Sequence, residues 1–258
     1  MHNGKIGSIS KEDREKLTRI YYEHEADGEC ERRYGTIVVM DVLGWKKTAT
    51  AETVKKYCDL TNELRSQIFN TLMRVSDNVE EELLDIVVLS DTICVFLDVD
   101  CSYCELNIFN EISKFVVSAL SKSIAFRGAI SRGEYFINKR RNIFMGDAFY
   151  EAIKYAEATE WAGIILTDSM AKALLENNSV ADLKKINVVS YKDIPYKEKV
   201  DSCYGNLVLV PKSLFPLSSN NLFDDISKMY EKTLLSNEEN VKIKLKNTLE
   251  FLKHLSLN

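Results

Sequence analysis

The sequence predicts an α+β protein built around an antiparallel or mixed sheet. Two observations lead to this prediction. Strand-like and helix-like patterns follow one another in the order β-α-β-β-α-β, with further α and β segments behind them. The second and third strands also meet directly at Ser90-Asp91, as the two strands of a hairpin do.

The first strand ends in an acid. Apolar β-formers run from Ile37 to Met40, and Asp41, two apolar residues and Gly44 follow them. An ionised carboxylate that is removed from water must be paired, hydrogen-bonded or bound to a cation. The alternative is a strand that ends at the surface, with Asp41 opening a turn.

The remaining elements follow in order. Residues 51–75 predict a helix, because apolar side chains form one stripe: Val54, Tyr57, Cys58, Leu60, Leu64, Ile68, Leu72 and Met73. Residues 83–98 predict the hairpin, and residues 104–123 a helix with an inward face of Leu106, Phe109, Ile112, Phe115, Val116 and Leu120. Later segments predict strands at 125–136, 143–145, 163–166, 186–191 and 204–210, with a helix over 147–159 and another after 166.

This order is the ferredoxin-like split β-α-β-β-α-β arrangement, enlarged by flanking helices. Residues 1–33 are expected to form an N-terminal helical extension and residues 34–212 one folded domain. SSNN at 218–221 resembles a linker, and residues 213–258 are expected to end in a helical tail with apolar Leu234, Val241, Leu245, Leu249 and Leu252.

Charge and hydropathy argue against some classes of protein. A net charge of −5 over 258 residues argues against a nucleic-acid or membrane-surface binder, although local cations could still bind a small anion. No stretch approaches the roughly 18 apolar residues of a membrane span. The N-terminus lacks the apolar core of a signal peptide, so a cytoplasmic protein is expected.

A second acid, Asp91, occupies the tip of the predicted hairpin. In the split layout the first strand lies beside that hairpin, so Asp41 and Asp91 can point into one cleft. Like charges that close require a cation between them. Oxygen ligands without histidine favour Mg²⁺ or Mn²⁺, and two such ions are a recurrent solution for attack at phosphorus.

Four motifs together resemble the class III nucleotidyl cyclases over roughly residues 34 to 210. They are D-V-L-G-W at 41–45, S-D-T at 90–92, R-G-A-I-S-R-G at 127–133 and G-D-A-F-Y-E-A at 146–152. The resemblance implies that residues 34–212 form the catalytic domain of a head-to-tail homodimer with active sites at the interface. It also implies cyclisation of a nucleoside triphosphate to a 3′,5′-cyclic monophosphate and diphosphate.

The resemblance assigns roles to particular residues. Asp41 and Asp91 match the ligands of two Mn²⁺ or Mg²⁺ ions per site, and Val42 matches a position whose carbonyl also contacts a metal. Leu43, Gly44 and Trp45 match the loop beneath the β- and γ-phosphates. Arg127 matches a triphosphate-binding arginine, the alternative being an exposed strand charge.

Four positions depart from the purine cyclases. Val87 and Ile143 stand where those enzymes carry polar base-reading side chains, and neither can hydrogen-bond a purine edge. Tyr150 and Lys154 stand where the family asparagine and arginine steady the transition state. Lysine keeps the charge without the bidentate fork. The alternative for both is a packed aromatic and a solvated cation.

These departures resemble the pyrimidine cyclases of the bacterial Pycsar antiphage system, which make cyclic UMP or cyclic CMP as second messengers. Selection of the smaller base is then expected from backbone groups or from neighbours such as Asn142 or Thr92. Two alternatives remain: an adenylate cyclase with an atypical base pocket, and a catalytically inactive cyclase-like dimer that binds nucleotide.

Overall fold

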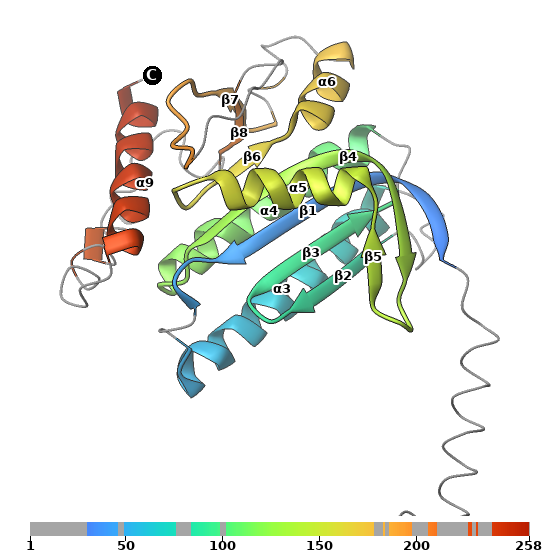
Figure 1. Ribbon diagram of the computed structural model, residues 1–258, viewed down its shortest axis with the longest axis horizontal. Coiled ribbons are helices and arrows are strands. Elements are labelled where there is room, and N and C mark those ends of the chain that lie inside the picture. The colour runs from blue at the N-terminus through green and yellow to red at the C-terminus, as the bar shows by residue number, and fades with distance from the viewer. Residues whose placement is uncertain are drawn as a thin grey trace, which may run out of the picture.

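The computed structural model describes residues 30–45, 49–75, 84–98, 102–177, 183, 186–197, 206–210, 227–228, 231 and 239–257. Its centre is an eight-stranded sheet in the order β2-β3-β1-β4-β6-β8-β7, with β5 paired to β4 (Figure 1). The strands are β1 (Glu31–Val42), β2 (Leu84–Leu89), β3 (Thr92–Leu97), β4 (Phe126–Asn138), β5 (Ile143–Met145), β6 (Ile164–Leu166), β7 (Val188–Ser190) and β8 (Leu207–Leu209). Only the β4–β6 pairing is parallel among these, so the sheet is mixed.

Strand β1 lies at the centre of the split core, between β3 and β4. Its apolar run from Ile37 to Met40 is fully buried, as expected for a strand with neighbours on both edges and packing on both faces. The register places Asp41 opposite Thr92 of β3 and opposite Arg127 of β4. Three segments that are distant in sequence therefore meet at the end of β1.

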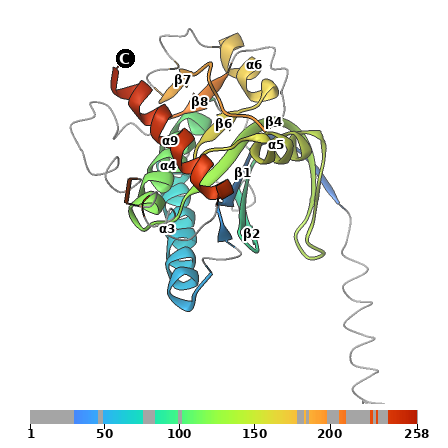
Figure 2. The same cartoon turned by 60° about the vertical axis from the view of Figure 1, so that its left-hand side comes forward.

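Helices cover both faces of the sheet (Figures 1 and 2). The helices α3 (Ala51–Val75) and α4 (Ser102–Ser121) pack together on one face, and α5 (Asp147–Ala158) packs on β4 and β1 from the other. Helix α3 buries Tyr57, Leu60, Leu64, Ile68 and Leu72.

The predicted stripe on α3 was too wide. Val54, Cys58 and Met73 are exposed, because the buried residues already repeat every three to four positions and fill the side that faces α4 and the sheet. The described inward residues of α4, from Phe109 to Leu120, are buried as predicted, and the side chain of Leu106 lies outside the described residues.

The C-terminal helix α9 (Glu239–Leu257) is anchored beside the connection between α5 and β6 (Figure 1). Trp161 in that connection is fully buried, and its ring lies 4.6 Å from Phe251 and 5.7 Å from Tyr191. Thr248 accepts a hydrogen bond from the Ala162 amide at 2.8 Å. Aromatic packing and this buried hydrogen bond hold α9 against residues 161–162.

The order β1-α3-β2-β3-α4-β4 confirms the predicted split α+β core with a mixed sheet. Helix α6 (Asp168–Asn177) follows β6, and the strands predicted near 186–191 and 204–210 are β7 and β8. The predicted N-terminal helix, the 218–221 linker and Leu234 lie outside the described residues. Within the described ranges, no helix combines the length and apolar character needed to cross a membrane.

Candidate functional site

Three polar side chains lie in one row across the sheet, where β1 ends. Directly opposed residues of antiparallel strands point to the same face, so Thr92, Asp41 and Arg127 are neighbours. Arg127 donates from Nε and Nη2 to Asp41 Oδ2 at 3.2 and 3.0 Å, and the Thr92 hydroxyl donates to Oδ1 at 3.4 Å. Asp41 therefore belongs to a partly buried polar network and does not open a turn.

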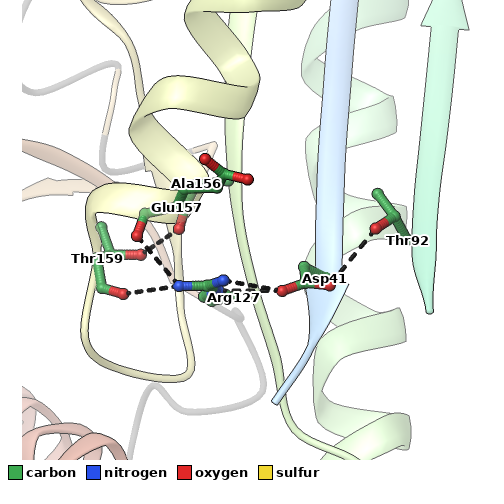
Figure 3. A network of polar contacts seen from close by, with 6 residues as sticks. All are labelled: Asp41, Thr92, Arg127, Ala156, Glu157 and Thr159. Atoms are coloured by element: carbon green, nitrogen blue, oxygen red, sulfur yellow. Dashed lines mark hydrogen bonds and ion pairs between the residues drawn. The ribbon is translucent and has the colours of Figure 1, made fainter. Parts of the chain in front are cut away.

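Arg127 is fixed from its other side by the end of α5. Its Nη1 donates to the carbonyls of Glu157 and Thr159 at 3.1 and 3.4 Å (Figure 3). Only 12% of the Arg127 side chain is exposed, so the alternative of an exposed strand charge is wrong. The α5 end is itself held, because the Lys197 amide donates to the Ala158 carbonyl at 2.8 Å.

Burial dominates the electrostatics of Asp41. Partial removal from water raises the pKa of this carboxyl above its ordinary value, and the hydrogen bond and charge of Arg127 oppose that rise. The charge of Asp91 raises the pKa of Asp41 further. A cation at this position would offset both the cost of burying the Asp41 charge and its repulsion by Asp91.

Asp91 stands in the two-residue turn between β2 and β3, as predicted. Ser90 adopts a positive φ of 60°, which lets the turn close tightly, and the Asp91 carbonyl accepts a hydrogen bond from the Val42 amide at 3.1 Å. This contact joins the hairpin tip to the end of β1. The structure therefore brings Asp41, Val42 and Asp91 together from two elements.

The loop after β1 turns sharply at Gly44, whose φ of 75° suits a residue without a Cβ. The Val42 and Leu43 side chains are buried, and the Leu43 amide donates to the Ala125 carbonyl at 2.9 Å. That amide is already used within the protein, so it is not available to a phosphate. The Trp45 ring packs on Tyr57 at 5.0 Å, which ties this loop to α3.

The donor set fits Mg²⁺ or Mn²⁺ in part. Two carboxylates and a carbonyl offer the oxygen ligands that these ions take, and Mg²⁺ commonly binds one or two carboxylates together with substrate phosphates. Among the described residues, no group of three or more His, Cys, Asp or Glu side chains could hold a metal ion. Substrate oxygens would have to complete the coordination, and Asp41 would have to release part of its contact with Arg127.

Other predicted site residues lie away from this cluster within the same chain. Ile143 pairs with Asn138 at the far end of β4, and that 13-residue strand spans roughly 40 Å at about 3.3 Å per residue. Helix α5 begins beside the second half of β4, since Gly146, just before the helix, lies against Glu134 and Tyr135. Tyr150, in the first half of α5, is 59% exposed. A single chain does not unite Ile143 and Tyr150 with the acids.

The remaining predicted site residues lie on β2, on α5, on β3 and in the β4–β5 turn. Val87 lies on the edge strand β2, opposite Cys94, and packs partly against the core. Lys154 is exposed on α5, one turn after Tyr150. Of the two neighbours proposed for base selection, Thr92 instead holds Asp41, and Asn142 is exposed in the β4–β5 turn with a φ of 53°.

Sequence patterns did not identify the backbone carbonyls that hold Arg127, because any residue can supply a carbonyl. They also did not identify Lys244 of α9, whose pKa is lowered by burial and by the nearby cations Arg127 and Lys197. The only signal for Lys244 was a cation between two apolar positions of the predicted tail, Val241 and Leu245.

No protein-family model matches the chain, and no curated protein matches it. Among solved structures, the adenylyl cyclase CyaB from P. aeruginosa aligns at 14% identity and a TM-score of 0.45, over 70% of this chain and 95% of that one. An adenylate/guanylate cyclase/hydrolase from Silicibacter pomeroyi aligns at 17% identity and a TM-score of 0.45, over 70% and 98%. The catalytic core of a rhodopsin-guanylyl cyclase aligns at 12% identity and 0.44, over 70% and 96%. At these identities and TM-scores, the similarity assigns neither a family nor an activity to this chain.

Proposed function

We propose that this protein is a nucleotidyl cyclase that converts a nucleoside triphosphate to a 3′,5′-cyclic monophosphate and diphosphate. The observation that carries the proposal is the meeting of two motif acids. Asp91 directly precedes Thr92, which pairs with Asp41 across the strands and bonds its carboxylate, and the Asp91 carbonyl accepts from the Val42 amide. The charge of Asp91 also raises the pKa of Asp41. They belong to the four motifs, in the same order, that resemble the class III cyclases.

In the proposed reaction the ribose 3′-oxygen forms a bond to the α-phosphorus, and the bond from that phosphorus to its bridging oxygen breaks. Diphosphate leaves, and the hydroxyl proton passes to solvent. Mg²⁺ or Mn²⁺ ions, when bound, would activate the hydroxyl and neutralise the diphosphate. Asp41 and Asp91 would hold them, and Arg127 would exchange part of its contact with Asp41 for a terminal phosphate.

The proposed site needs a second subunit. Lys154 and Tyr150 are exposed on α5, and Val88 and Leu89 on β2 and Met145 on β5 are exposed apolar side chains. A head-to-tail homodimer would cover such apolar surface and bring the partner subunit's Lys154 to the α-phosphate. One complete site would then draw its acids from one chain and Lys154 from the other.

For the base, we propose a pyrimidine, UTP or CTP. Val87 and Ile143 cannot read a purine edge through side-chain hydrogen bonds, and Val87 already packs partly against the core. The further proposal, by resemblance to the Pycsar cyclases, is that cyclic UMP or cyclic CMP serves as a second messenger in bacterial antiphage defence in the cytoplasm.

The test is incubation of the purified chain with each of the four ribonucleoside triphosphates and Mn²⁺, with cyclic products separated by chromatography. Asp91→Ala is the matched loss variant, because Asp91 stands in a turn where its removal opens no core cavity. Formation of a cyclic nucleotide by the wild type and not by Asp91→Ala supports the proposal. Turnover of Asp91→Ala near the wild-type rate would contradict it.

A cyclase-like dimer that binds nucleotide without turnover is the second candidate. The engagement of Asp41 by Arg127 favours it, because this ion pair already satisfies one of the two acids. Nucleotide binding measured by calorimetry, with no cyclic product from any of the four triphosphates, would select this alternative.

A further inference from the structure

The C-terminal helix α9 carries a cation, Lys244, that has no part in the proposed reaction. Helix α9 lies against the segment that ends α5, where the Asn247 side chain donates to the Glu160 carbonyl at 2.7 Å and the Thr248 hydroxyl accepts from the Ala162 amide. Lys244 stands three and four positions before these two residues, so it lies on the same face of α9. That face is turned toward the segment whose carbonyls hold Arg127.

Lys244 is a half-buried cation, and among the described residues no hydrogen bond or ion pair joins its ammonium to a carboxylate. Burial lowers the pKa of Lys244, Arg127 and Lys197 lower it further, and Glu160 and Asp41 oppose the change. The hydrogen bonds agree with this grouping, because Arg127 and the Lys197 amide bond the carbonyls of residues 157–159, and the Lys244 face of α9 bonds residues 160–162 directly after them. Of the two carboxylates, Asp41 is already bonded to Arg127. A bound anion reduces the repulsion between cations in a partly dehydrated site.

We propose that Lys244 is a polyphosphate-binding residue, which with Arg127 and Lys197 receives the terminal phosphates of a nucleoside triphosphate at the edge of the Asp41 site. The inference rests on the proposed function for the identity of the ligand. It makes α9 part of the binding site, since Lys244 reaches the cluster only because Thr248 and Phe251 hold the helix against residues 161–162.

The three cations would have different roles. Arg127 sits beside the acids and presents a planar fork, which suits the phosphate next to the metal-binding oxygens. Lys244 would bind the outer phosphates as a point charge from α9. Lys197 is exposed, so water and salt screen its charge, and we expect the smallest contribution from it.

The experiment measures binding of inorganic tripolyphosphate to the full chain by calorimetry, at low salt and without divalent metal. We expect Lys244→Ala to weaken binding about tenfold, as loss of one charge-assisted hydrogen bond does, and Lys244→Arg to stay within about threefold of wild type. Lys246→Ala is the matched control: Lys246 is exposed on the same helix, pairs with Glu250 at 3.9 Å, and should leave binding unchanged.

Equal binding by Lys244→Ala and wild type, or no binding by wild type, would overturn the inference. Circular dichroism of Lys244→Ala checks that α9 stays folded, and if it does not, Lys244→Gln replaces it under the same criterion. If no nucleotide is cyclised but tripolyphosphate binding depends on Lys244, the cyclase proposal fails and the binding site stands. With an active enzyme, the KM for the triphosphate should rise in Lys244→Ala by about the factor lost in binding, with little change in kcat.

Discussion

The ion pair of Asp41 and Arg127 should couple the two residues by about 2 kcal/mol. Exposed ion pairs contribute about 0.2–1 kcal/mol, whereas breaking a fully buried pair costs about 3–5 kcal/mol. The side chains of Asp41 and Arg127 are 26% and 12% exposed, and two N–H groups reach one carboxylate oxygen at 3.0 and 3.2 Å. These values place the pair between the two limits.

A double-mutant cycle isolates this coupling. Asp41→Ala, Arg127→Met and the double variant are unfolded in urea at pH 7, and the coupling is the difference between the summed and the combined losses in the free energy of unfolding. With a slope of about 2 kcal/mol per molar urea, 2 kcal/mol corresponds to a difference of about 1 M in the midpoints. Circular dichroism and tryptophan fluorescence must report the same transition for this reading to hold.

The matched control is the exposed pair of Lys122 and Glu63, which meet at 3.2 Å with 37% and 41% of their side chains exposed. The same cycle there should give less than about 1 kcal/mol. A coupling for Asp41 and Arg127 below about 0.5 kcal/mol, or no larger than that of the control pair, would refute the reasoning. It would mean that solvent screens the end of β1 more than its burial indicates.

Three further predictions follow from the same site. Co-expressed Asp41→Ala and Lys154→Ala chains should regain partial cyclase activity, because a heterodimer holds one intact site; confirmed heterodimers without activity would argue for sites within one chain. UTP or CTP should turn over at least about tenfold faster than ATP or GTP, which corresponds to a difference of about 1.4 kcal/mol in activation free energy. The double variant Val87→Lys with Ile143→Asp should reduce this preference, and equal wild-type rates on ATP and UTP would favour an adenylate cyclase. Burial raises the pKa of Asp41 in the folded protein, so its stabilising contribution is present below the ordinary carboxyl pKa and is lost as pH rises through the folded value. The free energy of unfolding should therefore fall less between pH 4 and 7 in Asp41→Asn than in the wild type. A parallel pH dependence in both proteins would contradict this.

The sequence by itself determined the element order and the position of both acids. The apolar run before Asp41 and the direct meeting of two strands at Ser90-Asp91 are local signals, and β1, β2 and β3 follow them closely. Helical periodicity likewise located α3, although not the width of its buried face. Such patterns can be recognised in the sequence because each depends on residues that are close together along the chain, within one or two helical turns.

Tertiary structure decided what these residues contact. The register of β1 against β3 and β4 sets Asp41 opposite Thr92 and Arg127, and a shift of one residue would have turned these side chains to different faces. Backbone carbonyls at the end of α5 hold Arg127, and the packing of α9 on residues 160–162 brings Lys244 close enough for the charge of Arg127 to lower its pKa. None of these contacts has a local signature, because strand pairing and helix docking join segments that are far apart in the chain.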